Sequence, residues 1–128
     1  MLEIRLDLPW RIIPKKRHYR RKKGGGFYLS KEFKAFEKAC LTWLLQWGNQ
    51  AIRGPVTVQV TYFFKDGRWV GDEDNLNATV GDMLQKGGFV ENDKLIHWLP
   101  CTRIITKGHG RVPQEGAEIV IEQWRKAK

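Results

Sequence analysis

Residues 55–88 read PVTVQVTYFFKDGRWVGDEDNLNATVGDMLQKGG and carry the clearest structural pattern in the chain. Apolar residues occupy alternate positions from Val56 to Phe64, and valine, tyrosine and phenylalanine favour extended backbone, so this part predicts a β-strand. Apolar residues then recur at helical spacing before a pair of glycines, which predicts a helix over residues 74–86. A cluster of acidic residues falls at the junction between the strand and the helix.

Four further segments on either side of this stretch show regular patterns. Alternating apolar residues predict a strand over residues 2–8. Helical spacing over residues 30–48 starts with a serine suited to an N-cap and stops at a glycine. Two more strands are predicted over residues 95–105, where Pro100 breaks the run, and over residues 117–124. The order of elements predicts a mixed α/β (α+β) fold, with a mixed sheet of about four strands and two main helices.

The chain has 128 residues, of which 41% are hydrophobic and 12% aromatic, so it can bury a core without staples. We expect a single domain over residues 1–128. Its two cysteines, Cys40 and Cys101, lack metal-ligand spacing, which argues against structural zinc and suits a reducing compartment. No run approaches the roughly 20 apolar residues that span a bilayer, and the first residues lack the order of a secretory signal. We therefore expect a soluble, cytoplasmic protein without a membrane partner.

The chain carries a formal net charge of +9, and eight basic residues crowd between Arg11 and Lys23 without one acid. Pro14 and three consecutive glycines predict an irregular loop over residues 9–28. Lysine and arginine neutralise backbone phosphates, and an exposed ring can stack on a base, so nucleic acid is the favoured partner. The alternative is a charge run that is merely solvated. The predicted DNA-binding residues are Arg11, Lys15, Lys16, Arg17, Tyr19, Arg20, Arg21, Lys22, Lys23 and Lys107.

Six of the fourteen carboxylates lie between Asp72 and Asp93, against the basic balance of the chain. Crowded carboxylates repel one another, and a divalent cation relieves that repulsion. On an extended segment Asp72 and Asp74 point to the same face, and the predicted helix turns the chain back so that residues 91–93 supply a third oxygen ligand. This arrangement suits Mg²⁺, which supports phosphodiester hydrolysis. The alternative is structural, with Asp72 and Asp74 capping the helix and favouring its positive end.

The chain resembles the RusA family of Holliday junction resolvases on several segments. The family's Asp-x-Asp-Asn-Leu motif corresponds to Asp72-Glu73-Asp74-Asn75-Leu76, and its Lys-x-Gly-Phe block with the following acidic stretch corresponds to residues 86–93. The spacing between the two blocks also matches. Supporting likeness comes from Leu8-Pro9-Trp10, the basic loop with Arg17, Tyr19 and Arg20, residues 105–108 and the final strand.

The resemblance implies a small homodimeric, Mg²⁺-dependent endonuclease, with Mn²⁺ able to replace Mg²⁺, that is encoded by a bacterium, a phage or a prophage. It implies that Asp72, Asp74 and Asp93 are both the metal ligands and the catalytic carboxylates. It further implies that the substrate is four-way junction DNA, cut by paired nicks during DNA recombination and repair. A two-fold symmetric dimer suits such a junction.

The chain departs from the family at Ala78, where the family has a catalytic lysine that stabilises charge on the phosphate. Either Lys65, Lys94 or Lys107 reaches the site instead, or the protein cuts slowly, or it binds junctions without cutting. Three functions therefore stay open from the sequence. They are a junction-resolving enzyme, a catalytically weak branched-DNA-binding protein of the same fold, and a general RNA or DNA nuclease.

Overall fold

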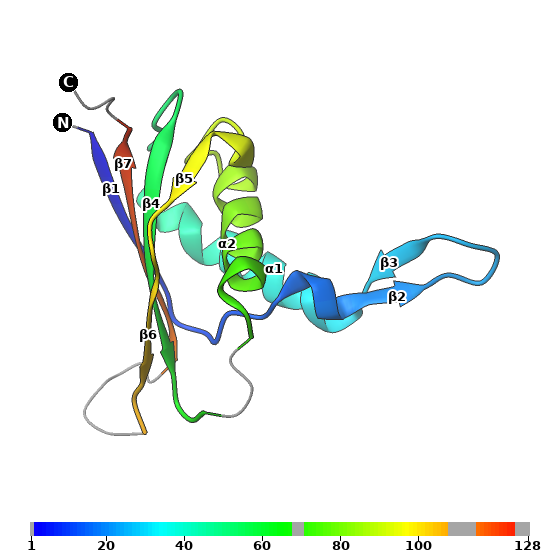
Figure 1. The fold of residues 1–128 in the computed structure, drawn as a ribbon. Helices are drawn as coiled ribbons and strands as arrows, with labels where there is room; N and C mark the ends of the chain where they lie inside the picture. Colours follow the sequence, from blue (N-terminus) through cyan, green and yellow to red (C-terminus); the bar gives the residue numbers. More distant parts are fainter. Residues whose placement is uncertain (1, 68–70, 108–114, 125–128) are drawn as a thin grey trace.

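The computed structural model describes residues 2–67, 71–107 and 115–124 (Figure 1). Gly108, which belongs to one segment of the family resemblance, lies outside these ranges, as does the side chain of Arg17. The elements in chain order are β1 (Glu3–Leu8), η1 (Lys15–His18), β2 (Tyr19–Arg21), β3 (Phe27–Leu29), α1 (Lys31–Leu44), η2 (Leu45–Trp47), β4 (Val56–Phe64), α2 (Glu73–Lys86), η3 (Asp93–Leu95), β5 (Ile96–Trp98), β6 (Thr102–Ile105) and β7 (Gly116–Gln123).

The main sheet is mixed and has five strands, with β4 at its centre. β4 pairs antiparallel with β7, which pairs antiparallel with the edge strand β1. On its other side, β4 pairs in parallel with β5 along its first part and with β6 along its last part. Pro100 lies between β5 and β6, so the break predicted there is confirmed. The mixed α+β fold with two main helices is confirmed as well.

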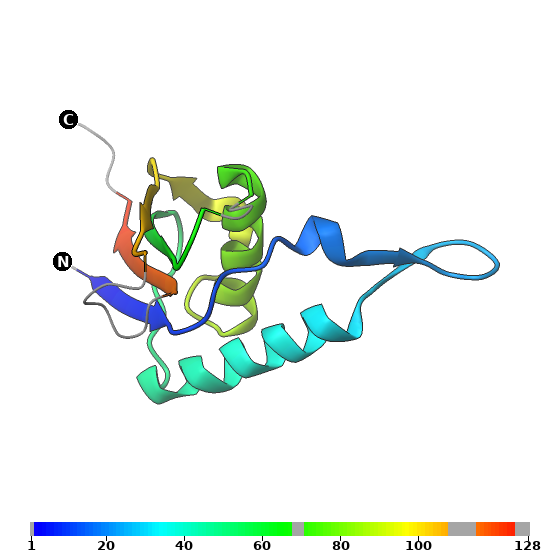
Figure 2. The ribbon, with the colours of Figure 1, turned by 90° about the horizontal axis from the view of Figure 1, so that it is seen from below.

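Both main helices cover the same face of this sheet (Figures 1 and 2). The alternating residues of β4 that face them are almost fully buried, and the same holds for the inward side of α2. Cys40 of α1 is also buried, and burial, with a smaller effect of Glu37, raises the pKa of its thiol to about 12. The thiol therefore stays protonated and packs as a small apolar group.

The positions at which the helices begin and end are set by capping and helix-breaking residues in the sequence. Ser30 Oγ accepts a hydrogen bond from the backbone N–H of Phe33 at 3.1 Å, which caps α1 as predicted. Gly48 has a φ of 66°, which ends the short turn after α1. α2 begins at Glu73, one residue before the predicted start. No helix in the described ranges is both long and apolar enough to cross a membrane.

Residues 19–29 form a two-stranded antiparallel hairpin that projects away from the sheet and the helices (Figures 1 and 2). We call this hairpin the arm. The irregular loop predicted over residues 9–28 is therefore wrong in its second half. Tyrosine, phenylalanine and leucine favour extended backbone on both sides of the turn, and Gly24, Gly25 and Gly26 close it with φ values of 92°, 110° and 80°.

The base of the arm is tied to α1 and α2. The backbone N–H of Ser30 donates to the carbonyl of His18 at 2.7 Å, and His18 Nδ1 lies 2.8 Å from Ser30 Oγ. Lys15 Nζ lies 3.3 Å from Asp82 Oδ2, and Lys86 Nζ lies 3.1 Å from the same oxygen. These contacts hold the start of the arm while its tip stays exposed.

Arg11 and Lys15, two basic residues of the run before Gly24, are neutralised by acids that are distant in sequence. Lys15 pairs with Asp82, and Arg11 Nη1 lies 3.2 Å from Glu115 Oε2 and 3.5 Å from Asp66 Oδ1. The view of the whole run as uncompensated charge is therefore wrong, because long-range folding brings acids to these two positions.

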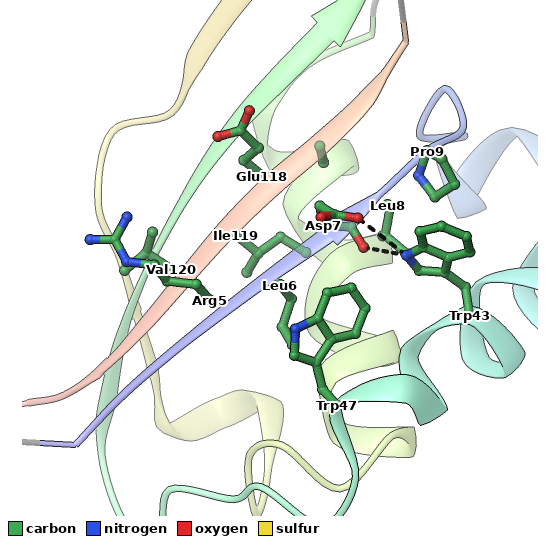
Figure 3. Close-up of a pocket in the computed structure, with 11 residues that line it drawn as sticks. Arg5, Leu6, Asp7, Leu8, Pro9, Trp43, Trp47, Glu118, Ile119 and Val120 are labelled. Atoms are coloured by element: carbon green, nitrogen blue, oxygen red, sulfur yellow. Dashed lines mark hydrogen bonds between the residues drawn. The ribbon is translucent and has the colours of Figure 1, made fainter. Parts of the chain in front are cut away.

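The edge strand β1 is covered by the indole ring of Trp43 (Figure 3). Trp43 Nε1 donates to the backbone carbonyl of Asp7 at 2.9 Å and lies 3.3 Å from Asp7 Oδ1. Trp43 and Trp47 line a cavity of about 510 Å³ against β1 and β7. Trp43 thus satisfies one of the backbone groups that an edge strand leaves unpaired.

Candidate functional site

The acidic block lies where the chain passes from β4 to α2. Asp72 is extended, with φ −80° and ψ 147°, whereas Glu73 and Asp74 belong to the first helical turn. The expectation that Asp72 and Asp74 share one face of an extended segment is therefore wrong, because the helix starts between them. Asp72 occupies the N-cap position, but its side chain accepts no hydrogen bond from the helix, so simple capping does not account for it.

A groove of about 440 Å³ lies between the start of α2 and the segment that links β5 to β6. We call it the acidic groove. Ala78 opens it, because its methyl group is the smallest side chain on this part of the helix. Its lining residues are Glu73, Asp74, Asn77, Ala78, Trp98, Leu99 and Pro100.

Glu73 anchors the helix to the segment between β5 and β6, on the far side of this groove. Its Oε1 accepts a hydrogen bond from the backbone N–H of Cys101 at 2.9 Å. The hydrogen bond from that backbone N–H, followed by one from the Cys101 side chain, and the charge of Arg103 hold the pKa of Glu73 below its ordinary value. Glu73 therefore serves the structure of the junction.

Asp72 and Asp74 are exposed, and their carboxylates have no hydrogen bond or ion pair with any residue in the described ranges. Two uncompensated carboxylates at a helix N-terminus are hard oxygen donors. Mg²⁺ is commonly held by one or two carboxylates together with water and substrate phosphate. The donor set therefore fits Mg²⁺.

Asp93 lies further along the same side of α2. Its backbone N–H donates to Gln85 Oε1 at 3.0 Å, and its Cβ would lie 3.7 Å from a Cβ built on Gly81. Asp74 and Gly81 are seven residues apart, which is roughly 10 Å along a helix axis. Within the part of the chain that the structure describes, no three Asp, Glu, His or Cys side chains form a cluster that could hold a metal ion.

Gly81 also lets the other wall of the groove approach the helix. A side-chain carbon at this position would lie 3.0 Å from the ring of Trp98, which is tighter than ordinary contact. Asp74, Ala78 and Gly81 follow one another at helical spacing, so Ala78 lies one turn beyond Asp74 on the way to Asp93.

The three lysines considered as substitutes for a lysine at position 78 stand elsewhere. Lys65 follows β4, Lys107 follows β6, and Lys94 lies in η3 next to Asp93. Among the described residues, no hydrogen bond or ion pair joins their side chains to the acidic groove. Arg103, which sequence reasoning missed, is closer to the acidic block, because its Nη1 donates to the carbonyl of Gly71 at 3.2 Å and its charge acts on Glu73.

Sequence reasoning also missed a buried polar pair beneath the groove. The hydroxyl of Tyr62 in β4 donates to Asn77 Oδ1 in α2 at 2.6 Å. Both residues are buried, Tyr62 fully and Asn77 with 5% exposed. A signal was present in the sequence, since Asn77 stands between Leu76 and Val80 on the apolar side of the helix, where a polar residue needs a partner.

The predicted DNA-binding residues divide into two groups. Arg11 and Lys15 pair with acids of the main body, and Lys107 follows β6, a strand that lies at a distance from the arm (Figure 1). The others lie on the arm or just before it, and the exposed rings of Tyr19, Phe27 and Tyr28 accompany them. The residues of the arm and its approach are Lys16, Arg17, Tyr19, Arg20, Arg21, Lys22 and Lys23.

Comparison with known proteins shows to which class of proteins this chain belongs. A family model described as endodeoxyribonuclease RusA matches residues 9–122, a range that includes the arm, the acidic groove and Asp93. A relative from Aquifex aeolicus (strain VF5), described as crossover junction endodeoxyribonuclease RusA, is 31% identical over 127 residues, which cover 98% of this chain and 95% of the relative. The class is that of the endodeoxyribonucleases. Within it, the chain belongs to the RusA family, so the resemblance predicted from the acidic motif is confirmed.

Proposed function

We propose that this protein is a homodimeric, Mg²⁺-dependent endonuclease that cuts four-way DNA junctions. The observation that carries the proposal is the family match over residues 9–122, together with two uncompensated carboxylates of its motif, Asp74 in the lining of the acidic groove and Asp72 just before α2. The relative from Aquifex aeolicus is named as a crossover junction endodeoxyribonuclease, which supports the choice of substrate. A dimer supports paired cuts, because a four-way junction has two-fold symmetry.

In the proposed mechanism, Asp72 and Asp74 would hold the metal ion, and Asp93 would contribute from the other end of the same side of α2. When bound, such an ion polarises the scissile phosphate and favours deprotonation of the attacking water. The arm binds the sugar-phosphate backbone through its basic residues and so brings the junction to the groove. Exposed rings on the arm stack on bases that the junction leaves accessible.

The cation next to the reacting phosphate is Arg103 in this proposal. Position 78 carries a methyl group, which supplies no charge, whereas Arg103 is bonded to the residue that precedes Asp72. A guanidinium can turn from the carbonyl of Gly71 to a phosphate oxygen, because both are oxygen acceptors. Arg103 is thus the described cation best situated to stabilise the charge that builds on the phosphate.

A second function is favoured by Ala78 itself. Without a lysine at this position, the protein would bind branched DNA through the arm and cut it slowly. Loss of one charge-stabilising donor typically lowers a rate about 100-fold to 1,000-fold, which leaves measurable turnover if the carboxylates still act.

The test is a cleavage assay with a labelled four-way junction and a matched linear duplex, in Mg²⁺ and in EDTA. We expect cleavage of the junction in Mg²⁺, and its loss after Asp72→Asn combined with Asp74→Asn, with junction binding in EDTA retained. Full activity of that double variant would overturn the site. Equal cutting of both substrates would favour a general nuclease, and cleavage that appears only after Ala78→Lys would favour the binding protein.

A further inference from the structure

The floor of the acidic groove contains a buried amide group with an unused donor. Asn77 is 5% exposed and lines the groove beside Asp74 and Ala78. Its Oδ1 accepts the hydroxyl of Tyr62, whereas Nδ2 has no hydrogen-bond partner within the described residues. A buried N–H₂ group without a hydrogen-bond acceptor lowers the stability of a protein. Its position at a groove therefore indicates that a bound ligand supplies the missing acceptor.

Tyr62 fixes which side of the amide faces the groove. Burial, followed by unfavourable electrostatic interactions with Cys101 and Glu73, raises the pKa of Tyr62 far above its ordinary value, so the hydroxyl keeps its proton and donates. Oδ1 of Asn77 is the acceptor for this proton. A reversed amide would leave the hydroxyl without its acceptor. Nδ2 is therefore the polar atom of Asn77 that is left for the groove.

We propose that Asn77 Nδ2 donates a hydrogen bond to a non-bridging oxygen of a DNA phosphate that lies in the acidic groove, and that Tyr62 is the residue that positions it. This inference rests on the proposed nuclease function, because it assigns a second group, besides Arg103, that touches the phosphate. Asn77 donates to the phosphate from the floor of the acidic groove. The neighbouring residue Ala78 has no side-chain donor that could do so. A neutral donor of this kind stabilises negative charge without adding a cation among the carboxylates.

The first experiment measures binding without a metal ion. A four-way junction is titrated in EDTA into ¹³C,¹⁵N-labelled protein, and the side-chain N–H₂ signals of Asn77 are assigned by their correlation with the backbone signals of the same residue. We expect these signals to shift with the same midpoint as the backbone signals of the arm. Asn77→Leu should weaken junction binding roughly 10-fold to 150-fold, the size of one hydrogen bond to a charged group, while Asn49→Leu at an exposed site should not.

The second experiment measures the chemical step in Mg²⁺ under single-turnover conditions. Asn77→Leu is expected to lower the cleavage rate roughly 100-fold, and Ala78→Lys in the same chain should restore part of it. Tyr62→Phe should lower the rate less, and it should reduce the shift of the Asn77 side-chain signals although the amide is still present. A purely structural role of Tyr62 would leave that shift unchanged.

Unshifted Asn77 side-chain signals during a titration that moves the arm would overturn the inference. So would equal junction affinity of Asn77→Leu and Asn49→Leu. If Asn77→Leu does not fold, the wild-type titration and the titration of Tyr62→Phe still show whether the Asn77 amide contacts the DNA. A protein that cuts nothing but shows the shift would refute the nuclease function while supporting phosphate binding, so the two failures are distinguishable.

Discussion

The acidic groove and the arm differ in how they are held. The groove is built on α2, whose apolar side shares the buried core with β4, and Asn77 on its floor is fixed by the buried hydrogen bond with Tyr62. The arm is held mainly at its base, and all three residues of β2 are exposed. Chemistry on a phosphate requires groups fixed to a fraction of an ångström, whereas electrostatic attraction to a DNA backbone tolerates movement. The two regions therefore suit different tasks, rate in the groove and affinity on the arm.

The largest expected effect tests whether the groove extends as far as Asp93. Asp93→Asn should lower single-turnover cleavage of a four-way junction by roughly 100-fold or more, because it removes a proposed metal ligand. Its junction affinity in EDTA should stay unchanged. Glu91→Gln is the matched control, since glutamine keeps an acceptor for the backbone N–H of Gly54. Equal cleavage by the two variants would exclude Asp93 from the site.

A smaller effect is expected when the arm loses charge. Arg20→Ala combined with Arg21→Ala should weaken junction binding about tenfold at moderate salt and reduce the salt dependence of log K by about 1.8, or 0.9 for each phosphate contact. The cleavage rate at saturating protein should hardly change. Lys34→Ala with Lys38→Ala removes the same charge from exposed positions on α1. If both pairs change the salt dependence equally, the arm has no special part in binding.

The smallest effect concerns the contact that joins the two regions. Burial raises the pKa of Asp82, but the hydrogen bond from Lys86 and the charges of Lys15 and Lys86 outweigh it and hold the pKa below its ordinary value of 3.8. The ionised carboxylate therefore stabilises the fold above that pH, and its contribution disappears as pH falls through the lowered pKa.

Asp82→Asn should accordingly lower the free energy of unfolding by about 1 kcal/mol at pH 7, a modest value because the ion pairs are partly exposed. The loss should shrink toward zero as the pH is brought below 3.8, where the wild-type carboxylate takes up its proton. Urea unfolding at a series of pH values measures both. A loss that does not vary with pH would mean that packing, and not charge, is what Asp82 supplies.

Much of the fold follows from short-range patterns in the sequence. The alternation from Val56 to Phe64 predicts the central strand because one side of it must be buried, and Ser30 predicts the start of α1 because its hydroxyl caps a helix. Pro100 predicts a break in the strand expected over residues 95–105, and the structure divides this segment there into β5 and β6. In each case a few neighbouring residues determine the local backbone conformation, and the packing of the core is compatible with it.

The arm and the site depend on features that local patterns do not contain. The hairpin could not be predicted from the run of lysines and arginines, because charged residues dominate this segment and it contains few of the aromatic residues that favour β-strands. Arg103 reaches Gly71 through the parallel pairing of β4 with β6, and Tyr62 meets Asn77 across the sheet-to-helix contact. The family motif identified the acids, but it could not say that Asp93 stands two helical turns from Asp74.

The tryptophan on the edge strand has a consequence for how molecules of this protein meet. The indole N–H of Trp43 is hydrogen-bonded to the carbonyl of Asp7. A strand from another molecule can therefore pair with β1 at this residue only after the ring has moved away. The sheet therefore does not simply continue from one molecule into the next. A ring placed over one unpaired carbonyl is one of the ways in which an edge strand is protected from pairing with another chain.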